Sequence, residues 1–211
     1  MAVEIKWLGH ASFRIAGAGS VVYIDPWKVG PDISGHDADV VFVSHSHFDH
    51  CSAPDIKKVS KKDTTIVAPA DAIAELHAAN AVTPEEQVQL KDVTIEPVAA
   101  YNIGKSFHPK GNSWLGAVFT IDGKRIYYAG DTDLIPEMSD LKDVDVALLP
   151  VGGTYTLNAA EAAQACKAIG CKMAIPYHWG DIVGSEADAK KFAKAASCEA
   201  KVLQPGESVS I

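Results

Sequence analysis

Hydrophobic residues occur along this chain in short runs that are separated by Gly, Pro, Asp and Asn. Several runs are continuous rather than alternating, which is typical of strands buried on both faces. Between two of them, Asp122-Gly123-Lys124 is typical of a hairpin turn. The pattern predicts a first strand near residues 1–6 and further strands over Val21–Ile24, Val40–Val43, Thr64–Val67, Val93–Pro97, Ala117–Ile121, Arg125–Tyr128, Val144–Leu149, Met173–Pro176 and Val202–Leu203.

Segments with helical signals lie between these runs. Ser52 and Asp55 form a capping-box pattern, which predicts a helix that ends near Val59. Further helices are expected over Asp71–Ala79, from Asn158 to Gly170 and from Ser185 to Ala196. Strands that alternate with helices predict layered α/β packing, in which helices cover the faces of sheets.

The length and composition indicate one folded unit. With 211 residues, the chain is long enough for one well-buried core and short for two. We find no low-complexity stretch and no Pro/Gly/Ser linker, so we expect a single domain over residues 1–211. No run approaches the roughly 18 apolar residues that a membrane helix requires. Residues 1–6 lack the basic start and apolar core of a signal peptide.

The charge and the cysteines narrow the expected surroundings of the protein. A formal net charge of −8 disfavours a nucleic-acid surface, which needs clustered Lys and Arg. The densest basic cluster, Lys57-Lys58 with Lys61-Lys62, is expected on a solvated helix face. Cysteines at positions 51, 166, 171 and 198 form no CxxC pair and no regular framework. They predict reduced thiols in a cytoplasmic protein. From the net charge and the lack of a long apolar run, we expect neither nucleic acid nor a membrane as a partner.

The strongest chemical signal is Ser44-His45-Ser46-His47-Phe48-Asp49-His50, directly after the predicted strand Val40–Val43. Side chains alternate along extended chain, so His45 and His47 project to the same side. Three imidazoles and a carboxylate in so short a segment are unfavourable unless a cation organises them. Such ligands suit zinc, iron or manganese. The alternative is a His-rich loop in solvent, which we consider less favoured.

Two other predicted strands also end at a potential ligand. Arg125–Tyr128 leads to Asp131, and Met173–Pro176 leads to His178. The carboxyl ends of strands are where α/β proteins collect their active sites. Alone, Asp131 could be a turn residue and His178 a core histidine. Together with the histidine-rich motif, they predict a shared metal site.

These motifs, in this order, resemble those of the metallo-β-lactamase superfamily. The carrying motifs are HxHxDH at 45–50, His108, Gly130-Asp131 and His178. Supporting segments are Trp7-Leu8-Gly9-His10-Ala11-Ser12, Tyr23-Ile24-Asp25-Pro26 and Pro150-Val151-Gly152-Gly153-Thr154-Tyr155-Thr156. The resemblance covers nearly the whole chain and is most detailed for a compact branch of hydrolases that includes L-ascorbate 6-phosphate lactonase.

The resemblance implies an αβ/βα four-layer sandwich, with two mixed sheets, helices outside and the site at one edge. It implies two divalent metal ions, one on His45, His47 and His108 and the other on Asp49, His50 and His178, with Asp131 as the bridge. Asp25 would support the motif loop. The third family motif often reads Gly-His-Thr-x-Gly, whereas His108 here stands in Phe107-His108-Pro109-Lys110-Gly111.

The expected chemistry is hydrolysis by hydroxide that the two metal ions generate. Asp49 and Asp131 are the catalytic candidates, and a weakly positive centre favours a small anionic ester, lactone or phosphoester. The chain leaves little room for the large recognition inserts of the nuclease and glyoxalase branches, so those branches are less favoured. Zinc is expected first, with manganese or iron as alternatives. A non-haem iron redox enzyme and a non-catalytic metal-binding module remain alternative functions.

The roles of several other residues stay open at this level. His10 could contact substrate or be hydrogen-bonded in the core, and Lys110 could hold an anionic group or be an exposed loop residue. Cys51 is expected in the core rather than among the ligands. Others without a motif are His36 and His77, expected in solvent, and Trp114, Tyr155 and Trp179, which would line a pocket or simply pack.

Overall fold

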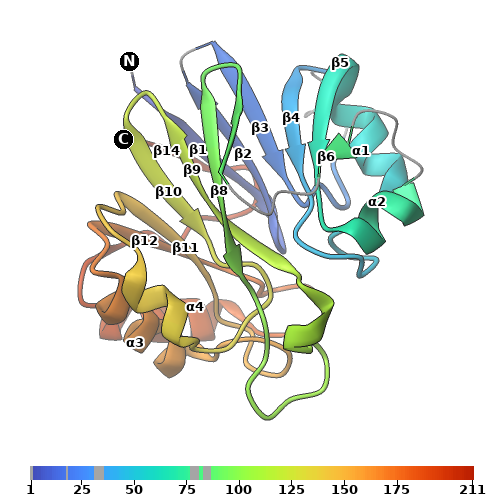
Figure 1. Cartoon of the computed structure of the whole chain (residues 1–211). Coiled ribbons are helices and arrows are strands. Elements are labelled where there is room, and N and C mark those ends of the chain that lie inside the picture. Colours follow the sequence, from blue (N-terminus) through green and yellow to red (C-terminus); the bar gives the residue numbers. More distant parts are fainter. Residues whose placement is uncertain (1, 18, 31–35, 77–80, 83–86) are drawn as a thin grey trace.

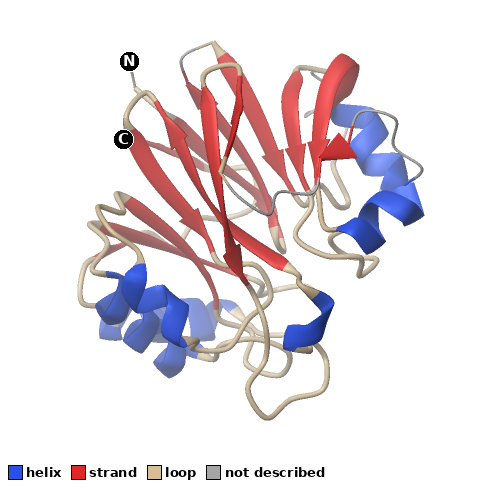
Figure 2. Cartoon of the chain, viewed as in Figure 1, coloured by secondary structure: helices blue, strands red, loops and turns tan. Residues whose placement is uncertain are grey.

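The computed structural model describes residues 2–17, 19–30, 36–76, 81–82 and 87–211. Two β-sheets face each other, and helices cover their outer faces (Figures 1 and 2). The predicted αβ/βα sandwich of two mixed sheets is therefore confirmed. No described helix combines the length and apolar character needed to cross a membrane.

The first sheet has the strand order β14-β1-β2-β3-β4-β5-β6. Its strands are β1 (Glu4–Gly9), β2 (Ser12–Gly17), β3 (Ser20–Ile24), β4 (Ala38–Phe42), β5 (Ser60–Val67), β6 (Ala81–Val82) and β14 (Ser208–Ser210). Pairing is antiparallel from β14 to β3 and parallel from β3 to β6. The carboxyl ends of β3 and β4 therefore point to the same edge of this sheet.

The second sheet has the order β13-β12-β11-β10-β9-β8-β7. Its strands are β7 (Val88–Leu90), β8 (Val93–Ala99), β9 (Leu115–Ile121), β10 (Lys124–Tyr128), β11 (Val146–Pro150), β12 (Met173–Tyr177) and β13 (Glu199–Ala200). β10, β11, β12 and β13 run parallel to one another. β9 and β10 form the predicted hairpin around Asp122-Gly123.

The continuous apolar run of β4 is explained by its two covered faces. Phe42 faces the core between the sheets, where its ring meets Phe119 of β9 edge-to-face at 5.2 Å. Val41 faces the opposite way, into a second apolar cluster with Ile56 and Val59 of α1 (Ala53–Val59). Each fully buried side chain of this kind contributes about 1.5–3 kcal/mol to folding. A strand that is buried on both faces therefore lacks the alternation of apolar and polar residues that is typical of a half-exposed strand.

Four α-helices lie in the described part of the chain. They are α1, α2 (Ala70–Leu76), α3 (Ala159–Ile169) and α4 (Glu186–Ala195), beside the 3₁₀ turns η2 (Lys110–Asn112) and η3 (Pro136–Asp140). The predicted cap of α3 is present, because Asn158 and Glu161 form a reciprocal capping box. The predicted end of α2 beyond Leu76 lies outside the described residues.

The structure corrects two sequence expectations. Val202 and Leu203 form no strand, because the chain there passes from β13 in the second sheet to β14 in the first. The four clustered lysines do not share a helix face: Lys57 and Lys58 belong to α1, but Lys61 lies in β5 and pairs with Asp39 at 2.5 Å.

Candidate metal centre

The predicted ligands meet where the two sheets converge at one edge. The motif 45–50 follows β4 of the first sheet, whereas Asp131 follows β10 and His178 follows β12 of the second. His108 lies in the loop between β8 and β9. Leu115 N donates to Ser44 O at 3.0 Å and ties the two sheets together beside the motif. Strand direction thus explains why residues far apart in sequence share one site.

The first group of possible ligands contains His45, His47 and His108. One ring nitrogen of each lies within 4.8 Å of the others, and His45 Nε2 is 3.0 Å from His47 Nδ1. Asn102 Oδ1 accepts from the backbone N of His108 and lies 3.0 Å from its Nδ1. When Nδ1 carries the proton, the lone pair of His108 Nε2 is left for a metal ion.

Two residues that contact the histidines of this group belong to none of the family motifs. Asn102 is itself held by Asp133 Oδ1 at 3.2 Å and by Tyr155 O at 2.9 Å. Trp114 packs its ring against His45 at 4.9 Å and against His47 at 4.8 Å, while its Nε1 donates to Asp71. The sequence alone does not decide the role of Trp114 and gives no signal for Asn102, because both roles depend on contacts between segments that are far apart in the chain.

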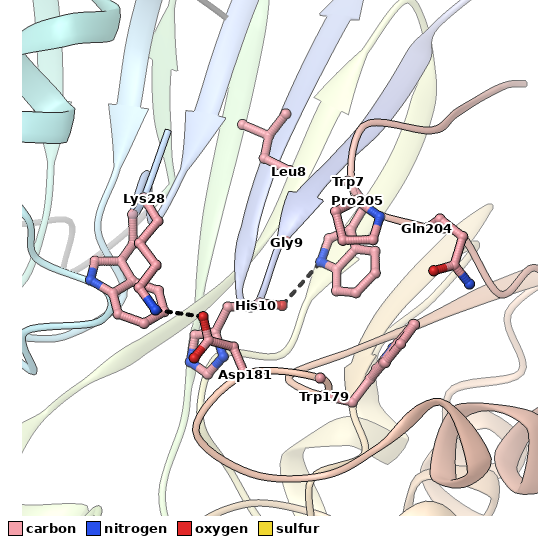
Figure 3. Close-up of a pocket in the computed structure, with 11 residues that line it drawn as sticks. Trp7, Leu8, Gly9, His10, Lys28, Trp179, Asp181, Gln204 and Pro205 are labelled. Carbon is pink, nitrogen blue, oxygen red and sulfur yellow. Dashed lines mark hydrogen bonds and ion pairs between the residues drawn. The ribbon is translucent and has the colours of Figure 1, made fainter. Parts of the chain in front are cut away.

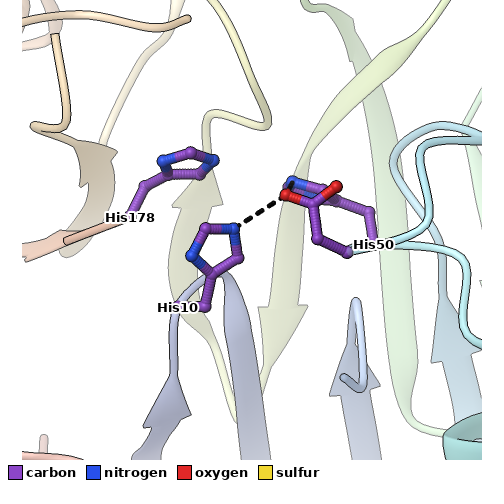
Figure 4. A group of neighbouring side chains, drawn as sticks. His10, His50 and His178 are labelled. Carbon is purple, nitrogen blue, oxygen red and sulfur yellow. Dashed lines mark hydrogen bonds and ion pairs between the residues drawn. The ribbon is translucent and has the colours of Figure 1, made fainter. Parts of the chain in front are cut away.

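The second group contains His10, Asp49, His50 and His178. His10 Nε2 lies 2.9 Å from Asp49 Oδ2, and the rings of His10 and His178 are 4.1 Å apart (Figure 4). The sequence predicted Asp49, His50 and His178 here. His10, whose role was open, comes from the turn between β1 and β2 and completes the group.

Asp131 lies between the two groups. Its Oδ2 is 3.3 Å from His108 Nε2 in the first group and 3.1 Å from His178 Nε2 in the second. Its Oδ1 is 3.4 Å from His50 Nε2. One buried carboxylate therefore faces imidazoles of both groups, which is the position that a bridging ligand requires.

Asp25 holds the motif loop from behind. Its carboxylate accepts from Ser44 N at 2.7 Å, Ser44 Oγ at 2.5 Å and Tyr128 OH at 2.6 Å, and it lies 2.7 Å from His50 Nδ1. His50 thereby donates through Nδ1 and turns Nε2 toward Asp131. These contacts agree with the supporting role that the resemblance implies for Asp25.

The buried charges perturb one another strongly. Burial opposes charge on His50, but Asp131 and Asp25 raise its pKa well above its usual range. Burial likewise opposes charge on Asp131, but the imidazoles of His178 and His50 hold its pKa well below the usual range. Burial and the neighbouring His50 lower the pKa of His45 well below its usual range. Such opposed shifts in one cluster are typical of functional sites.

Unpaired buried atoms in the cluster support metal binding independently of the sequence motifs. Several buried ring and carboxylate atoms have no hydrogen-bond partner among the described residues: His10 Nδ1, His50 Nε2, His108 Nε2, Asp131 Oδ1, and Nδ1 and Nε2 of His178. Leaving buried polar atoms unpaired costs about 1–3 kcal/mol each. Imidazole nitrogens and carboxylate oxygens are ligands for zinc, iron and manganese, so bound cations would satisfy the atoms that face Asp131, namely Nε2 of His50, His108 and His178, together with Asp131 Oδ1.

The backbone is unusual at three of these residues. His10, Asp25 and His178 have φ values of 47°, 42° and 61°, the left-handed region that residues other than glycine seldom adopt. Such conformations cost of order 1–3 kcal/mol and cluster at functional sites. The backbone N of His178 donates to His10 O at 3.0 Å, so a hydrogen bond joins two of these strained positions.

Residues whose roles were open mostly lie outside the centre. Lys110 is exposed and pairs with Glu137 at 3.0 Å. Cys51 packs in the α1 cluster, where burial raises the pKa of its thiol to about 12. His36 is exposed, as predicted, and His77 lies outside the described residues. Tyr155 packs edge-to-face on Phe107.

A pocket of about 370 Å³ lies on the His10 side of the centre (Figure 3). The indoles of Trp7, Trp27 and Trp179 contribute its apolar walls, and His10 is among its lining residues. The ammonium of Lys28 lies 4.1 Å from the Trp27 ring and 2.6 Å from Asp181 Oδ2. The pocket thus combines aromatic surface with one exposed ion pair.

Comparison with known proteins agrees with the fold and with a metal-dependent hydrolase. A β-lactamase superfamily domain model matches residues 4–178. A UPF0173 metal-dependent hydrolase of Nitratidesulfovibrio vulgaris is 32% identical over 239 residues, covering 100% of this chain and 96% of that protein. A crystal structure from Parabacteroides distasonis, of a protein provisionally named a metal-dependent hydrolase, aligns with a TM-score of 0.86 at 29% identity and covers 97% and 94% of the two chains.

A third likeness concerns the fold alone. The metallo-β-lactamase fold protein YhfI of Bacillus subtilis aligns with a TM-score of 0.80 at 13% identity, covering 99% of each chain. The family model over residues 4–178 and the 32% identical relative show that the chain belongs to the β-lactamase superfamily and, within it, to the UPF0173 family of metal-dependent hydrolases. The prediction of an enzyme, a hydrolase of the metallo-β-lactamase fold, is confirmed.

Proposed function

We propose that this chain uses two divalent metal ions to hydrolyse a small anionic ester, lactone or phosphoester. The proposed ligands form two groups that share one carboxylate: His45, His47 and His108; Asp49, His50 and His178; and Asp131 between them. The observation that carries the proposal is the placement of Asp131, within 3.4 Å of imidazoles from both groups. A single-metal site would not need a buried carboxylate that faces two sets of ligands.

The residues divide the expected work between them. Divalent ions bound here would supply hydroxide near neutral pH and stabilise negative charge that develops on the substrate. Asp49 would orient the attacking water, because its carboxylate is held by His10 and its side chain is 11% exposed. Asn102 and Asp25 would keep His108 and His50 in the tautomers that present Nε2.

Zinc is the metal that we propose, since imidazole and carboxylate ligands are typical of catalytic zinc sites. Manganese and iron bind similar ligands, and availability decides between them as much as the ligand set does. The protein is proposed to be cytoplasmic. Support for this location comes from its four free thiols.

The pocket beside His10 is the proposed site for the part of the substrate that is not cleaved. Its indoles would cover an apolar portion, and Lys28 could exchange its exposed partner Asp181 for an anionic group of the substrate. The net charge of −8 repels polyanions over the rest of the surface. These features support a small anionic substrate rather than RNA.

A panel of substrates tests this function. Purified protein would be loaded separately with Zn²⁺, Mn²⁺ or Fe²⁺ and assayed on lactones, phosphodiesters, β-lactams and RNA. We expect turnover of a small anionic ester or lactone to exceed cleavage of RNA with at least one metal. The Asp131→Asn variant, purified identically, measures the background from contaminating hydrolases.

Other outcomes of the same panel would overturn the proposal. RNA cleavage that is faster than hydrolysis of every small ester would contradict the substrate class. Tightly bound iron with oxygen-dependent spectral changes and no hydrolysis would favour the redox alternative. Stoichiometric metal with no turnover of any substrate would favour a binding module.

His108 has the least typical surroundings of the proposed ligands, so its removal is an informative test. We expect His108→Ala to lose about 10–100-fold or more in metal affinity and activity, since even partners outside the ligand shell contribute that much. Metal titration and kinetics measure the effect. His36→Ala, which removes an exposed histidine, is the matched control. Unchanged metal content in His108→Ala would mean that another side chain completes the first group.

A further inference from the structure

Three cysteines bring their sulfur atoms together away from the histidine cluster. The Sγ atom of Cys166 lies 3.5 Å from that of Cys171 and 2.9 Å from that of Cys198, and the third separation is 3.6 Å. Cys171 precedes β12, whereas His178 follows it. At about 3.3 Å per residue of strand, roughly 20 Å separates the two clusters. The thiols therefore do not belong to the site described above.

Local structure explains how these residues meet without a sequence motif. Cys166 lies on the buried side of the last turns of α3, and Gly170 ends this helix in the left-handed conformation with φ of 68°. The reversal at Gly170, whose N donates to Cys166 O at 3.0 Å, returns Cys171 toward Cys166. Cys198 arrives from the segment that precedes β13, the neighbour of β12 in the sheet.

We propose that Cys166, Cys171 and Cys198 form a second metal site, which takes one thiophilic ion of the Zn²⁺ or Cu⁺ type. Thiolate sulfur is the ligand that selects such ions over Mg²⁺ or Mn²⁺. A disulfide needs two sulfur atoms, but here each sulfur atom contacts both of the others. A set of three donors is what a metal ion uses.

The geometry needs little adjustment to hold an ion. Sulfur atoms bound to one ion at about 2.3 Å lie about 3.8–4.0 Å apart. Two of the three separations, 3.5 and 3.6 Å, must open by about 0.2–0.5 Å, and the pair Cys166–Cys198, at 2.9 Å, must open by about 1 Å, a movement within one side-chain rotation. Cys198 is half-buried, whereas Cys166 and Cys171 are buried. The site is therefore reached from the Cys198 side.

The sulfur of Cys166 is the point that several donors share in this cluster. The sulfur atoms of Cys171 and Cys198 lie 3.5 Å and 2.9 Å from that of Cys166, within hydrogen-bond distance. The hydroxyl of Ser197 also donates to the Cys166 sulfur at 3.8 Å. On binding, each cysteine exchanges its S–H bond for a bond to the ion, so a Zn²⁺ complex of three thiolates releases three protons and carries one negative charge.

Cd²⁺ is a suitable probe, because its thiolate complexes show a sulfur-to-metal charge-transfer absorption that histidine and carboxylate complexes lack. The full chain, reduced and stripped of metal, would be titrated with Cd²⁺. We expect this absorption to saturate at one ion per chain, with proton release. Loss of a ligand should weaken this binding by at least about tenfold, since loss of an outer-shell partner alone costs that much. We therefore expect Cys198→Ser and Cys171→Ser to lose most of the absorption.

Cys51→Ala is the matched control, since it removes the remaining buried thiol and should leave the absorption unchanged. The half-buried Cys198 keeps the test valid if Cys171→Ser misfolds, and circular dichroism checks each variant. The proposal is overturned if Cys198→Ser titrates like wild type. It is also overturned if reduced wild type shows no thiolate absorption while all four thiols react with a thiol reagent, or if Cys166 and Cys198 only form a disulfide.

Discussion

Asp131→Asn should leave the protein folded with about one metal ion per chain and with hydrolysis reduced on the order of 10³-fold. Among the proposed ligands, only Asp49 and Asp131 are negative, and Asp131 alone faces both groups. Two unit charges 4 Å apart interact by about 4 kcal/mol at an effective dielectric of about 20, so removal of this charge beside a divalent ion costs several kcal/mol. A catalytic metal ion contributes several kcal/mol to the rate, and about 1.4 kcal/mol is tenfold.

Elemental analysis and kinetics on identically prepared proteins measure this result. Asp55→Asn is the matched control, because Asp55 is also buried but accepts from Lys28 N and Lys58 Nζ rather than facing a histidine. We expect that control to keep the metal content of wild type. Two tightly held ions and normal turnover in Asp131→Asn would mean that Asp131 is a structural turn residue.

Asp25→Asn should lower the free energy of unfolding by about 3–5 kcal/mol, the range for breaking a buried charge pair. Asp25 is fully buried, and its carboxylate accepts hydrogen bonds from Ser44, His50 and Tyr128. Asparagine replaces one accepting oxygen by an NH₂ group. That group would face the N–H and O–H groups that now donate to the Asp25 carboxylate, so donor would meet donor. We also expect weaker metal binding, because His50 would lose the partner that fixes its tautomer.

Urea unfolding of the metal-free proteins measures the stability change without a contribution from bound ions. Asp39→Asn is the matched control, since Asp39 is buried in β4 but pairs with the half-buried Lys61 and the exposed Lys91. Partly exposed pairs contribute about 1 kcal/mol or less, so this variant should lose much less stability. Equal, small losses in both variants would show that Asp25 does not hold the motif loop.

The sequence by itself determined the parts of this protein that depend on near neighbours. The continuous apolar run Val40–Val43 predicts a strand, and the structure buries both faces of that strand. The histidine motif that follows is recognised from its own residues alone. Asn158 and Gly170 cap the two ends of α3, as predicted, since both caps are local hydrogen-bond patterns. The ordered ligand motifs also identified the superfamily.

Short edge strands were decided by tertiary structure. β14 pairs with β1 from the opposite end of the chain, and β6 and β13 are strands only because a partner backbone lies beside them. Val202–Leu203 has the apolar composition of a strand but, within the described residues, no partner strand beside it. Strand formation depends on cross-strand hydrogen bonds and packing more than on intrinsic preference.

The supporting residues of the site were decided in the same way. His10 is a lone histidine in the sequence, and it joins the second group only because β1 ends beside Asp49. Asn102 belongs to no motif, yet it orients His108. The cysteines show no regular spacing, and three of them meet through the reversal at Gly170 and the pairing of β12 with β13. Ligand types are readable from sequence because the chemistry restricts them, whereas their partners depend on which strands the fold brings side by side.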